Sequence, residues 1–91
     1  MRKLKMARLE LDIVAEVHRN ERGIATDLIF EDGSRFYDVD HGLDFDLIIE
    51  EGTGGGWPVI YLRGSEKNIR KWLEDNQWED IDWLLDEFME Q

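Results

Sequence analysis

The chain has 91 residues, 22 of them acidic and 11 basic, and carries a formal net charge of −11 at pH 7. This length gives one compact domain with a modest core, and the lack of cysteine excludes disulfides, zinc–thiolate sites and thiol catalysis. The acidic charge disfavours binding to nucleic acid or anionic membranes, and no segment approaches the roughly 20 apolar residues of a membrane span.

Residues 9–17 predict a long, half-buried strand. Apolar side chains recur there at every second position and alternate with polar ones, which is typical of a strand with one wet face. Val14 is the one apolar residue out of step. A turn is expected at residues 20–23, which include Asn and Gly, and a second strand over residues 24–31.

Asp32 and Gly33 predict a tight hairpin, because both residue types tolerate a positive φ angle. The chain is therefore expected to return as a third strand over residues 34–40. The pattern leaves open whether Phe36 or Tyr37 faces the core, since a shift of one residue in register exchanges the two faces of a strand.

Two more strands are expected, over residues 43–50 and 59–63. In the first of them, apolar residues alternate with Asp44, Asp46, Ile48 and Glu50, so its exposed face is mostly acidic. The glycine-rich run at residues 52–56 predicts a flexible loop between them. It does not match a phosphate-binding loop, because it follows two glutamates and leads into a strand rather than a helix.

The end of the chain predicts two helices. The first begins after Ser65, a favourable N-cap, and ends near Asn76. The second covers about residues 79–90, where four apolar residues have the spacing of a buried stripe: Ile81, Leu84, Leu85 and Phe88. We therefore predict a single α+β domain over residues 1–91, with a mostly antiparallel five-stranded sheet followed by two C-terminal helices packed on one face.

The negative charge is concentrated in the second part of the chain. Residues 1–37 carry seven basic and seven acidic side chains, whereas residues 38–91 carry four basic and fifteen acidic ones. Two segments, 38–51 and 74–90, contribute six and eight carboxylates without any Lys or Arg. Such a field attracts basic proteins; the alternative explanation is that the charge only keeps the domain in solution.

Trp83 is the residue that we single out for binding. On a helix it lies nearly opposite the apolar stripe, and Trp is enriched among binding hot spots. A partner's arginine could stack on its ring and pair with neighbouring acids; a Trp83 packed inside the protein or in a homodimer is the open alternative. The expected partner-binding surface contains Trp83, Trp57 and two groups of carboxylates: Glu79, Asp80, Asp82, Asp86, Glu87 and Glu90 on the helix, and Asp38, Asp40, Asp44 and Asp46 before and along the fourth strand.

The sequence holds no recognisable catalytic or metal site. The aspartates between residues 38 and 46 depart from the calcium-loop pattern, because Ile49 takes the place of the last ligand and no helices flank the segment. Ser34 and Ser65 are explained by a turn and a helix cap, which leaves no serine for a catalytic triad. We expect no enzymatic activity, no cofactor and no metal.

The segment from Gly54 to Leu73 contains Gly-Gly-Gly-Trp-Pro, a short strand, Gly64-Ser65 and a helix to Trp72-Leu73. It resembles a loop–strand–helix segment of small uncharacterised proteins from bacteriophages and related mobile elements. The resemblance covers about a fifth of the chain and implies no activity and no functional residues. It implies a setting in which small acidic proteins block host defence enzymes by presenting a DNA-like surface.

These observations predict a non-enzymatic acidic protein that binds a basic protein partner. One form of this hypothesis is a nucleic-acid mimic that inhibits a host defence enzyme, the partner then being a nucleic-acid-binding protein. The alternatives are an immunity-type inhibitor of one toxin and an accessory structural protein that forms a homodimer. No direct contact with nucleic acid or membrane is expected, and a cytoplasmic location is expected because Arg8, Glu10 and Asp12 interrupt the apolar run that a signal peptide needs.

Overall fold

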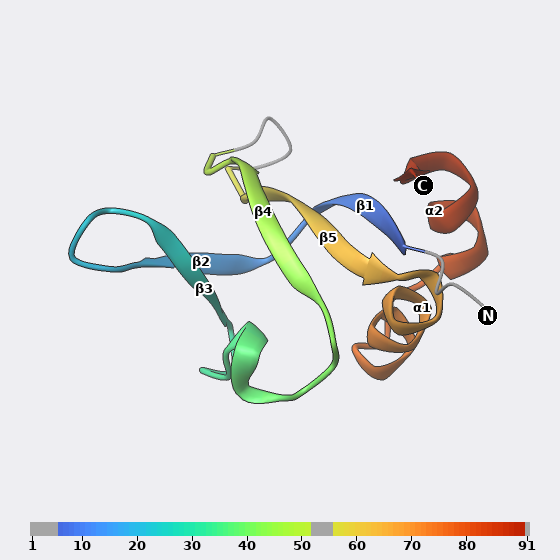
Figure 1. Ribbon diagram of the computed structural model, residues 1–91, viewed down its shortest axis with the longest axis horizontal. Coiled ribbons are helices and arrows are strands. Elements are labelled where there is room, and N and C mark those ends of the chain that lie inside the picture. The colour runs from blue at the N-terminus through green and yellow to red at the C-terminus, as the bar shows by residue number, and fades with distance from the viewer. Residues whose placement is uncertain (1–5, 52–55, 91) are drawn as a thin grey trace.

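A computed structural model of the chain describes residues 6–51 and 56–90. Within these ranges the protein is an α+β structure with two antiparallel sheets and two α-helices. The helices and a two-stranded hairpin lie at opposite ends of its longest axis (Figure 1). Neither helix in the described part of the chain has the length and apolarity needed to cross a membrane.

The larger sheet has four strands in the order β4-β5-β1-β6. They are β1 (Met6–Asp12), β4 (Asp44–Ile49), β5 (Val59–Ser65) and β6 (Met89–Glu90), and every pairing is antiparallel. The central strand β1 alternates strictly between exposed and buried side chains. One face of the sheet is therefore wet, and the other packs into the core, as the period of two predicts.

The strand expected over residues 9–17 is divided between two sheets. β1 ends at Asp12, and the chain continues as β2 (Ala15–Arg19), which pairs with β3 (Ala25–Phe30) in the second sheet. The division falls at Ile13-Val14: the Ile13 amide donates to the Pro58 carbonyl at 2.9 Å and its side chain stays buried, whereas Val14 is exposed. The residue that was out of step in the sequence therefore marks the change of direction.

The prediction of a third strand over residues 34–40 is wrong. The tight turn before it is confirmed, with Gly33 at φ 87°, but only an isolated bridge joins Ile29 to Arg35 before a short 3₁₀ helix, η1 (Phe36–Asp38), begins. The reason is that Phe36 packs inward rather than along a sheet, with its ring centroid 5.4 Å from that of Phe45. The expected five-stranded sheet is therefore wrong: β2 and β3 form a separate two-stranded sheet, and β6 joins the larger sheet as its fourth strand.

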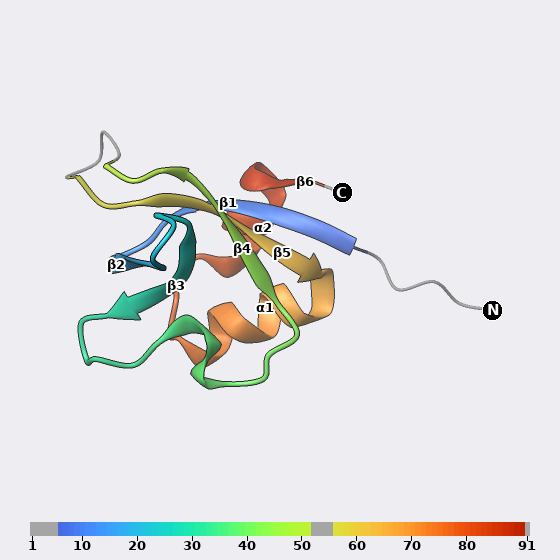
Figure 2. The same ribbon diagram turned by 60° about the vertical axis from the view of Figure 1, so that its left-hand side comes forward.

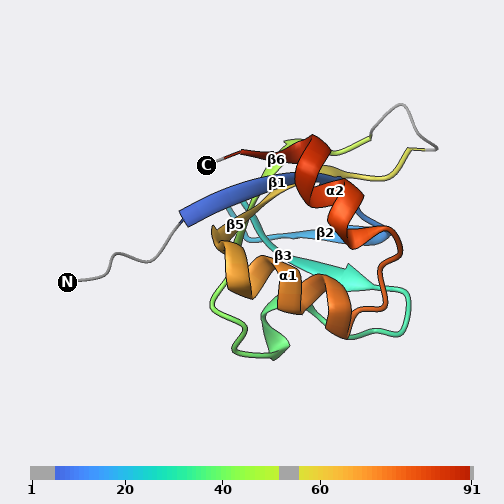
Figure 3. The same cartoon turned by 90° about the vertical axis from the view of Figure 1, so that its right-hand side faces the viewer.

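The two helices are α1 (Glu66–Asp75) and α2 (Ile81–Phe88). The N-cap is confirmed, because Ser65 Oγ accepts a hydrogen bond from the Asn68 amide at 3.1 Å, and Asn76 is confirmed as the C-cap of α1. α2 is shorter than expected, since its last residues leave the helix and pair with β1 as β6. Figures 2 and 3 show α1 under the sheet and α2 beside it, running up toward β6.

One core joins the two helices, both sheets and η1. Its fully buried side chains come from β1, β3, η1, β5 and α1 and include Leu9, Leu28, Phe36, Ile60, Leu62, Ile69 and Leu73. No charged or polar side chain of the described residues is buried in it. Burial of apolar area is therefore the main source of stability, and ionic groups remain at the surface.

The connection between the helices is a tight Schellman turn. The Gln77 amide donates to the Glu74 carbonyl at 3.1 Å, and the Trp78 amide donates to the Leu73 carbonyl at 3.0 Å. Gln77 has the left-handed conformation that this turn requires, with φ at 59°. The turn directs Trp78 back against α1, where its ring centroid lies 6.4 Å from that of Trp72.

Candidate protein-binding surface

An aromatic pair is exposed on α2. Trp83 is 56% exposed and Phe88 is 40% exposed, and their ring centroids lie 5.4 Å apart in an edge-to-face contact. The expected place of Trp83 outside the apolar stripe is confirmed, but the expected burial of Phe88 is wrong. Phe88 is the last residue of α2, and the next residue, Met89, packs against the core instead.

Four carboxylates near this pair have no ionic partner in the described part of the chain. Asp86 and Glu87 follow Trp83 by three and four residues, and Asp80 and Glu79 precede it by the same intervals, so all four lie on its side of the helix or just before it. All are exposed, and none forms an ion pair with any residue in ranges 6–51 and 56–90. We call Trp83, Phe88 and these four carboxylates the α2 surface.

Two other expected members of the surface are neutralised within the chain. Asp82 pairs with Arg70 of α1 at 2.9 Å, and Glu90 pairs with Arg8 of β1 at 2.8 Å. Both pairs are exposed, so each contributes at most about 1 kcal/mol to stability. They are better understood as contacts that hold α2 and β6 in place than as groups offered to a partner.

The local electrostatics of α2 are unfavourable at its C-terminal end. The last turn contains no basic residue, whereas Asp86, Glu87 and Glu90 lie near the negative end of the helix dipole. Each such carboxylate costs about 0.3–1 kcal/mol unless a cation is supplied from elsewhere. At the other end, Asp80 has a left-handed φ of 54° and makes no side-chain cap. Carboxylates at the C-terminus of a helix and an uncapped N-terminus are both locally unfavourable. When such features occur on one surface, they point to a functional site.

The acidic segment before and along β4 lies apart from the α2 surface. β4 and β6 are opposite edges of the four-stranded sheet, with β5 and β1 between them, which places them about 14 Å apart at the usual strand spacing. Asp44 and Asp46 both face Arg63, whose Nε donates to Asp46 at 2.6 Å. The two acidic segments therefore do not meet on the sheet, because Arg63 of β5 and Arg8 of β1 lie between Asp44 and Glu90.

The remaining groups of this segment serve local structure. Asp38 accepts a hydrogen bond from the Arg35 amide at 2.8 Å, which closes η1, while Asp40 is exposed before the turn into β4. The hydroxyl of Tyr37 donates to Asp44 at 3.1 Å. Burial, and then this hydrogen bond, raise the pKa of Tyr37 above its ordinary value, so the phenol stays protonated.

Trp57 also lies away from the α2 surface. It is 40% exposed and lines a shallow hollow beside the β2–β3 hairpin, together with Ala15, Glu16 and Ile29. Four of the five residues expected in the glycine loop before it, 52–55, lie outside the described residues. The structure therefore does not join Trp57 to Trp83, and we leave it out of the α2 surface.

His41, which lies between η1 and β4, is used in the fold. His41 accepts a hydrogen bond from the Leu43 amide at Nδ1 (3.1 Å), so its Nε2 carries the proton and donates to the Phe36 carbonyl at 2.7 Å. Ser34 forms a turn with Asp32, and Ser65 caps α1. Nowhere in the described chain do three His, Asp or Glu side chains gather in a way that could hold a metal ion.

Comparisons of the chain with protein-family models, with curated proteins and with solved structures gave no match.

Proposed function

We propose that this protein is a non-enzymatic binding protein whose α2 surface recognises a basic protein partner. The observation that carries the proposal is the exposed Trp83–Phe88 pair surrounded by four carboxylates that no described cation neutralises. An apolar anchor with a charged rim is the usual arrangement at protein interfaces, where a few aromatic residues supply most of the binding energy.

The net charge of −11 defines the kind of partner. It repels nucleic acid and anionic membranes, and it speeds the approach of a positively charged protein. Arginine suits the surface best, because a guanidinium group stacks on an indole and pairs with a flanking carboxylate at the same time. Binding of this kind weakens as salt is added, since the carboxylates are exposed.

A more specific form of the proposal is a nucleic-acid mimic that inhibits a host defence enzyme in the cytoplasm. The resemblance of residues 54–73 to proteins of mobile elements favours this form, and carboxylates on a helix imitate a row of phosphates. In the alternative form, an immunity-type inhibitor of one toxin, shape counts more than charge. Trp83→Ala would then cost more affinity than the loss of any one carboxylate.

The test is affinity capture with a charge-reversed variant. The protein is immobilised and exposed at low salt to a lysate of the source cells, and the bound proteins are identified. Asp86→Lys with Glu87→Lys reverses two unpaired carboxylates while leaving the Arg70 and Arg8 pairs intact. We expect this double variant and Trp83→Ala to lose a basic protein that the wild type retains until the salt is raised.

The matched control is Glu21→Lys with Glu51→Lys. Glu21 is exposed at the β2–β3 turn and Glu51 beyond β4, and neither forms an ion pair with a described residue. This control carries the same change in net charge and should capture the partner normally. Equal loss in both double variants would mean that only total charge matters, and the α2 surface would be rejected. Sedimentation at several concentrations tests the homodimer. A dimer that Trp83→Ala abolishes would mean that the α2 surface binds a second copy of this chain and not a basic partner.

A further inference from the structure

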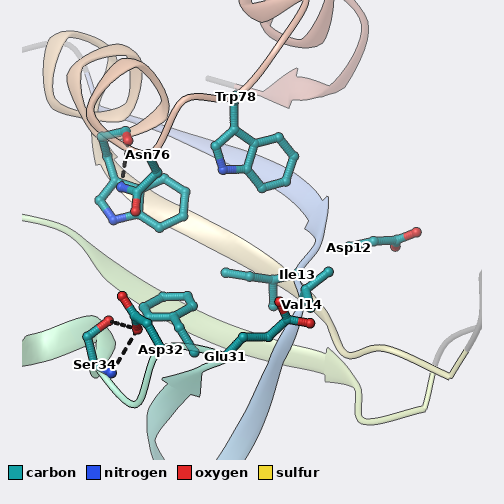
Figure 4. Close-up of a pocket in the computed structure, with 10 residues that line it drawn as sticks. Asp12, Ile13, Val14, Glu31, Asp32, Ser34, Asn76 and Trp78 are labelled. Atoms are coloured by element: carbon teal, nitrogen blue, oxygen red, sulfur yellow. Dashed lines mark hydrogen bonds between the residues drawn. The ribbon is translucent and has the colours of Figure 1, made fainter.

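A cleft lies at the end of α1, and none of its lining residues belongs to the α2 surface. The cleft encloses about 350 Å³ between the α1–α2 connection, the end of β1 and the turn after β3. Its lining combines three aromatic residues with three acidic ones: Phe30, Trp72, Trp78, Asp12, Glu31 and Asp32. Figure 4 shows Trp78 and Asn76 on one side and Glu31 and Asp32 on the other.

The aromatic wall is held rigidly. Trp72 is buried on α1, with its ring centroid 6.0 Å from that of Phe36 and 6.4 Å from that of Trp78. Trp78 is half-buried and fixed by the Schellman turn, and Phe30 is half-buried at the end of β3. The rings therefore offer a preformed apolar surface that need not reorganise when a ligand enters, and such preorganisation favours binding.

The charge of the cleft has one sign. No Lys or Arg of the described residues lines it, and its three acidic residues come from two segments of the chain. Glu31 and Asp32 lie opposite Trp78, whereas the side chain of Asp12 points away from the rings (Figure 4). The cleft also lies at the C-terminal end of α1, whose last turn has no basic residue, so the helix dipole adds negative potential at Trp72 and Asn76. Asp32 is kept ionised because two hydrogen bonds from Ser34 lower the pKa of its carboxyl.

We propose that this cleft binds the guanidinium group of an arginine side chain presented by the basic partner. The inference rests on the proposed function for the identity of the partner, and it adds a specific subsite to it. Aromatic faces and carboxylates together favour a cation, and the planar guanidinium both stacks and forms two parallel hydrogen bonds, which an ammonium group cannot do. A volume near the lower end of the range for ligand sites suits one side chain rather than a large cofactor.

The four tryptophans of the chain allow a direct test. Trp78 lines the cleft, Trp83 belongs to the α2 surface and Trp57 lies beside the hairpin, so their indole N–H signals in a ¹H–¹⁵N spectrum report three separate places. The probes are the capped tripeptides acetyl-Gly-Arg-Gly-amide and acetyl-Gly-Lys-Gly-amide. We expect the arginine peptide to shift the Trp78 signal and to bind there several-fold more tightly than the lysine peptide.

A matched pair of variants separates the cleft from general charge. Asp12→Asn with Glu31→Gln removes the Glu31 carboxylate opposite Trp78 and the Asp12 carboxylate at the edge of the cleft. It leaves the Asp32–Ser34 turn intact and should weaken arginine binding by about tenfold or more. Glu21→Gln with Glu51→Gln removes the same charge elsewhere and should change binding less than about twofold, as screened distant charges do.

Each failure has its own meaning. A shift at Trp83 with none at Trp78 would overturn the cleft site and leave the α2 surface standing. Equal affinity for both peptides would overturn the assignment to arginine. Equal weakening in the two double variants would reduce the cleft to nonspecific charge and also overturn it. The capture experiment, which uses other variants, decides the proposed function independently.

Discussion

The turn after α1 offers a prediction in which a substitution should stabilise the protein. Gln77 occupies the C′ position of the Schellman turn with φ at 59°, where glycine is the usual residue. Its side chain is exposed and makes no hydrogen bond to a described residue. Replacing Gln77 with glycine therefore removes a strained Cβ without removing a contact.

Two opposing contributions determine how much Gln77→Gly changes the free energy of unfolding. A left-handed conformation costs a residue other than glycine about 1–2 kcal/mol. Glycine gains more freedom in the unfolded chain, which costs about 0.5–1 kcal/mol on folding. The difference predicts that Gln77→Gly raises the free energy of unfolding by about 0.5–1 kcal/mol. For a domain of this size that corresponds to roughly 2–8 °C in Tm.

Urea unfolding followed by tryptophan fluorescence measures this difference, and thermal unfolding by circular dichroism checks it. Gln77→Ala is the matched control, because it shortens the side chain but keeps the Cβ; it should remain within about 0.5 kcal/mol of the wild type. A glycine variant no more stable than the alanine variant would refute the reasoning, since the left-handed strain would then be absent.

Three further predictions concern the core, a histidine and an aspartate. Phe36→Ala should lower the free energy of unfolding by about 3–5 kcal/mol in urea denaturation, because it empties a fully buried site; a loss under 1 kcal/mol would contradict this packing. Because the Leu43 amide donates to Nδ1, ¹⁵N spectra at neutral pH should show His41 as the Nε2–H tautomer, and the Nδ1–H tautomer would refute the assignment. Hydrogen bonds from Ser34 lower the pKa of Asp32 below its ordinary value of 3.8, so the unfolded chain binds this proton more readily. The wild type should therefore lose stability as the pH falls from 3.8 through the lower folded pKa, and Asp32→Asn should lose less over the same window; identical slopes would contradict this.

Features set by neighbouring residues could be predicted from the sequence. The N-cap at Ser65, the stop at Asn76 and the tight turn at Gly33 each depend on a few adjacent residues, and all three are confirmed. The prediction of a strand over residues 34–40 was wrong because the conformation of this segment depends on Phe36, whose ring packs against aromatic rings of distant elements. β6 is two residues long and pairs with β1 across most of the chain, which no local pattern indicates.

In the candidate site, too, features within one helix could be predicted from the sequence, whereas contacts between distant elements could not. The helical spacing placed Trp83 outside the buried stripe, because that position depends only on the geometry of one helix. The separation of the two acidic segments depends on β5 and β1 lying between β4 and β6, a matter of sheet order. The neutralisation of Asp82 by Arg70 likewise requires two helices to be docked. The cleft at Trp78 combines three separate segments and left no trace in the sequence.

The position of β1 has a consequence for how the protein is made. Both of its edges are filled by late segments, β5 from residue 59 onward and β6 at residues 89–90. A growing polypeptide can complete the β2–β3 hairpin early, but β1 has no partner until residues 59–65 have been translated. Pairings so distant along the chain form slowly. The α2 surface needs residues 79–88, so a translation product that stops before them would not display it.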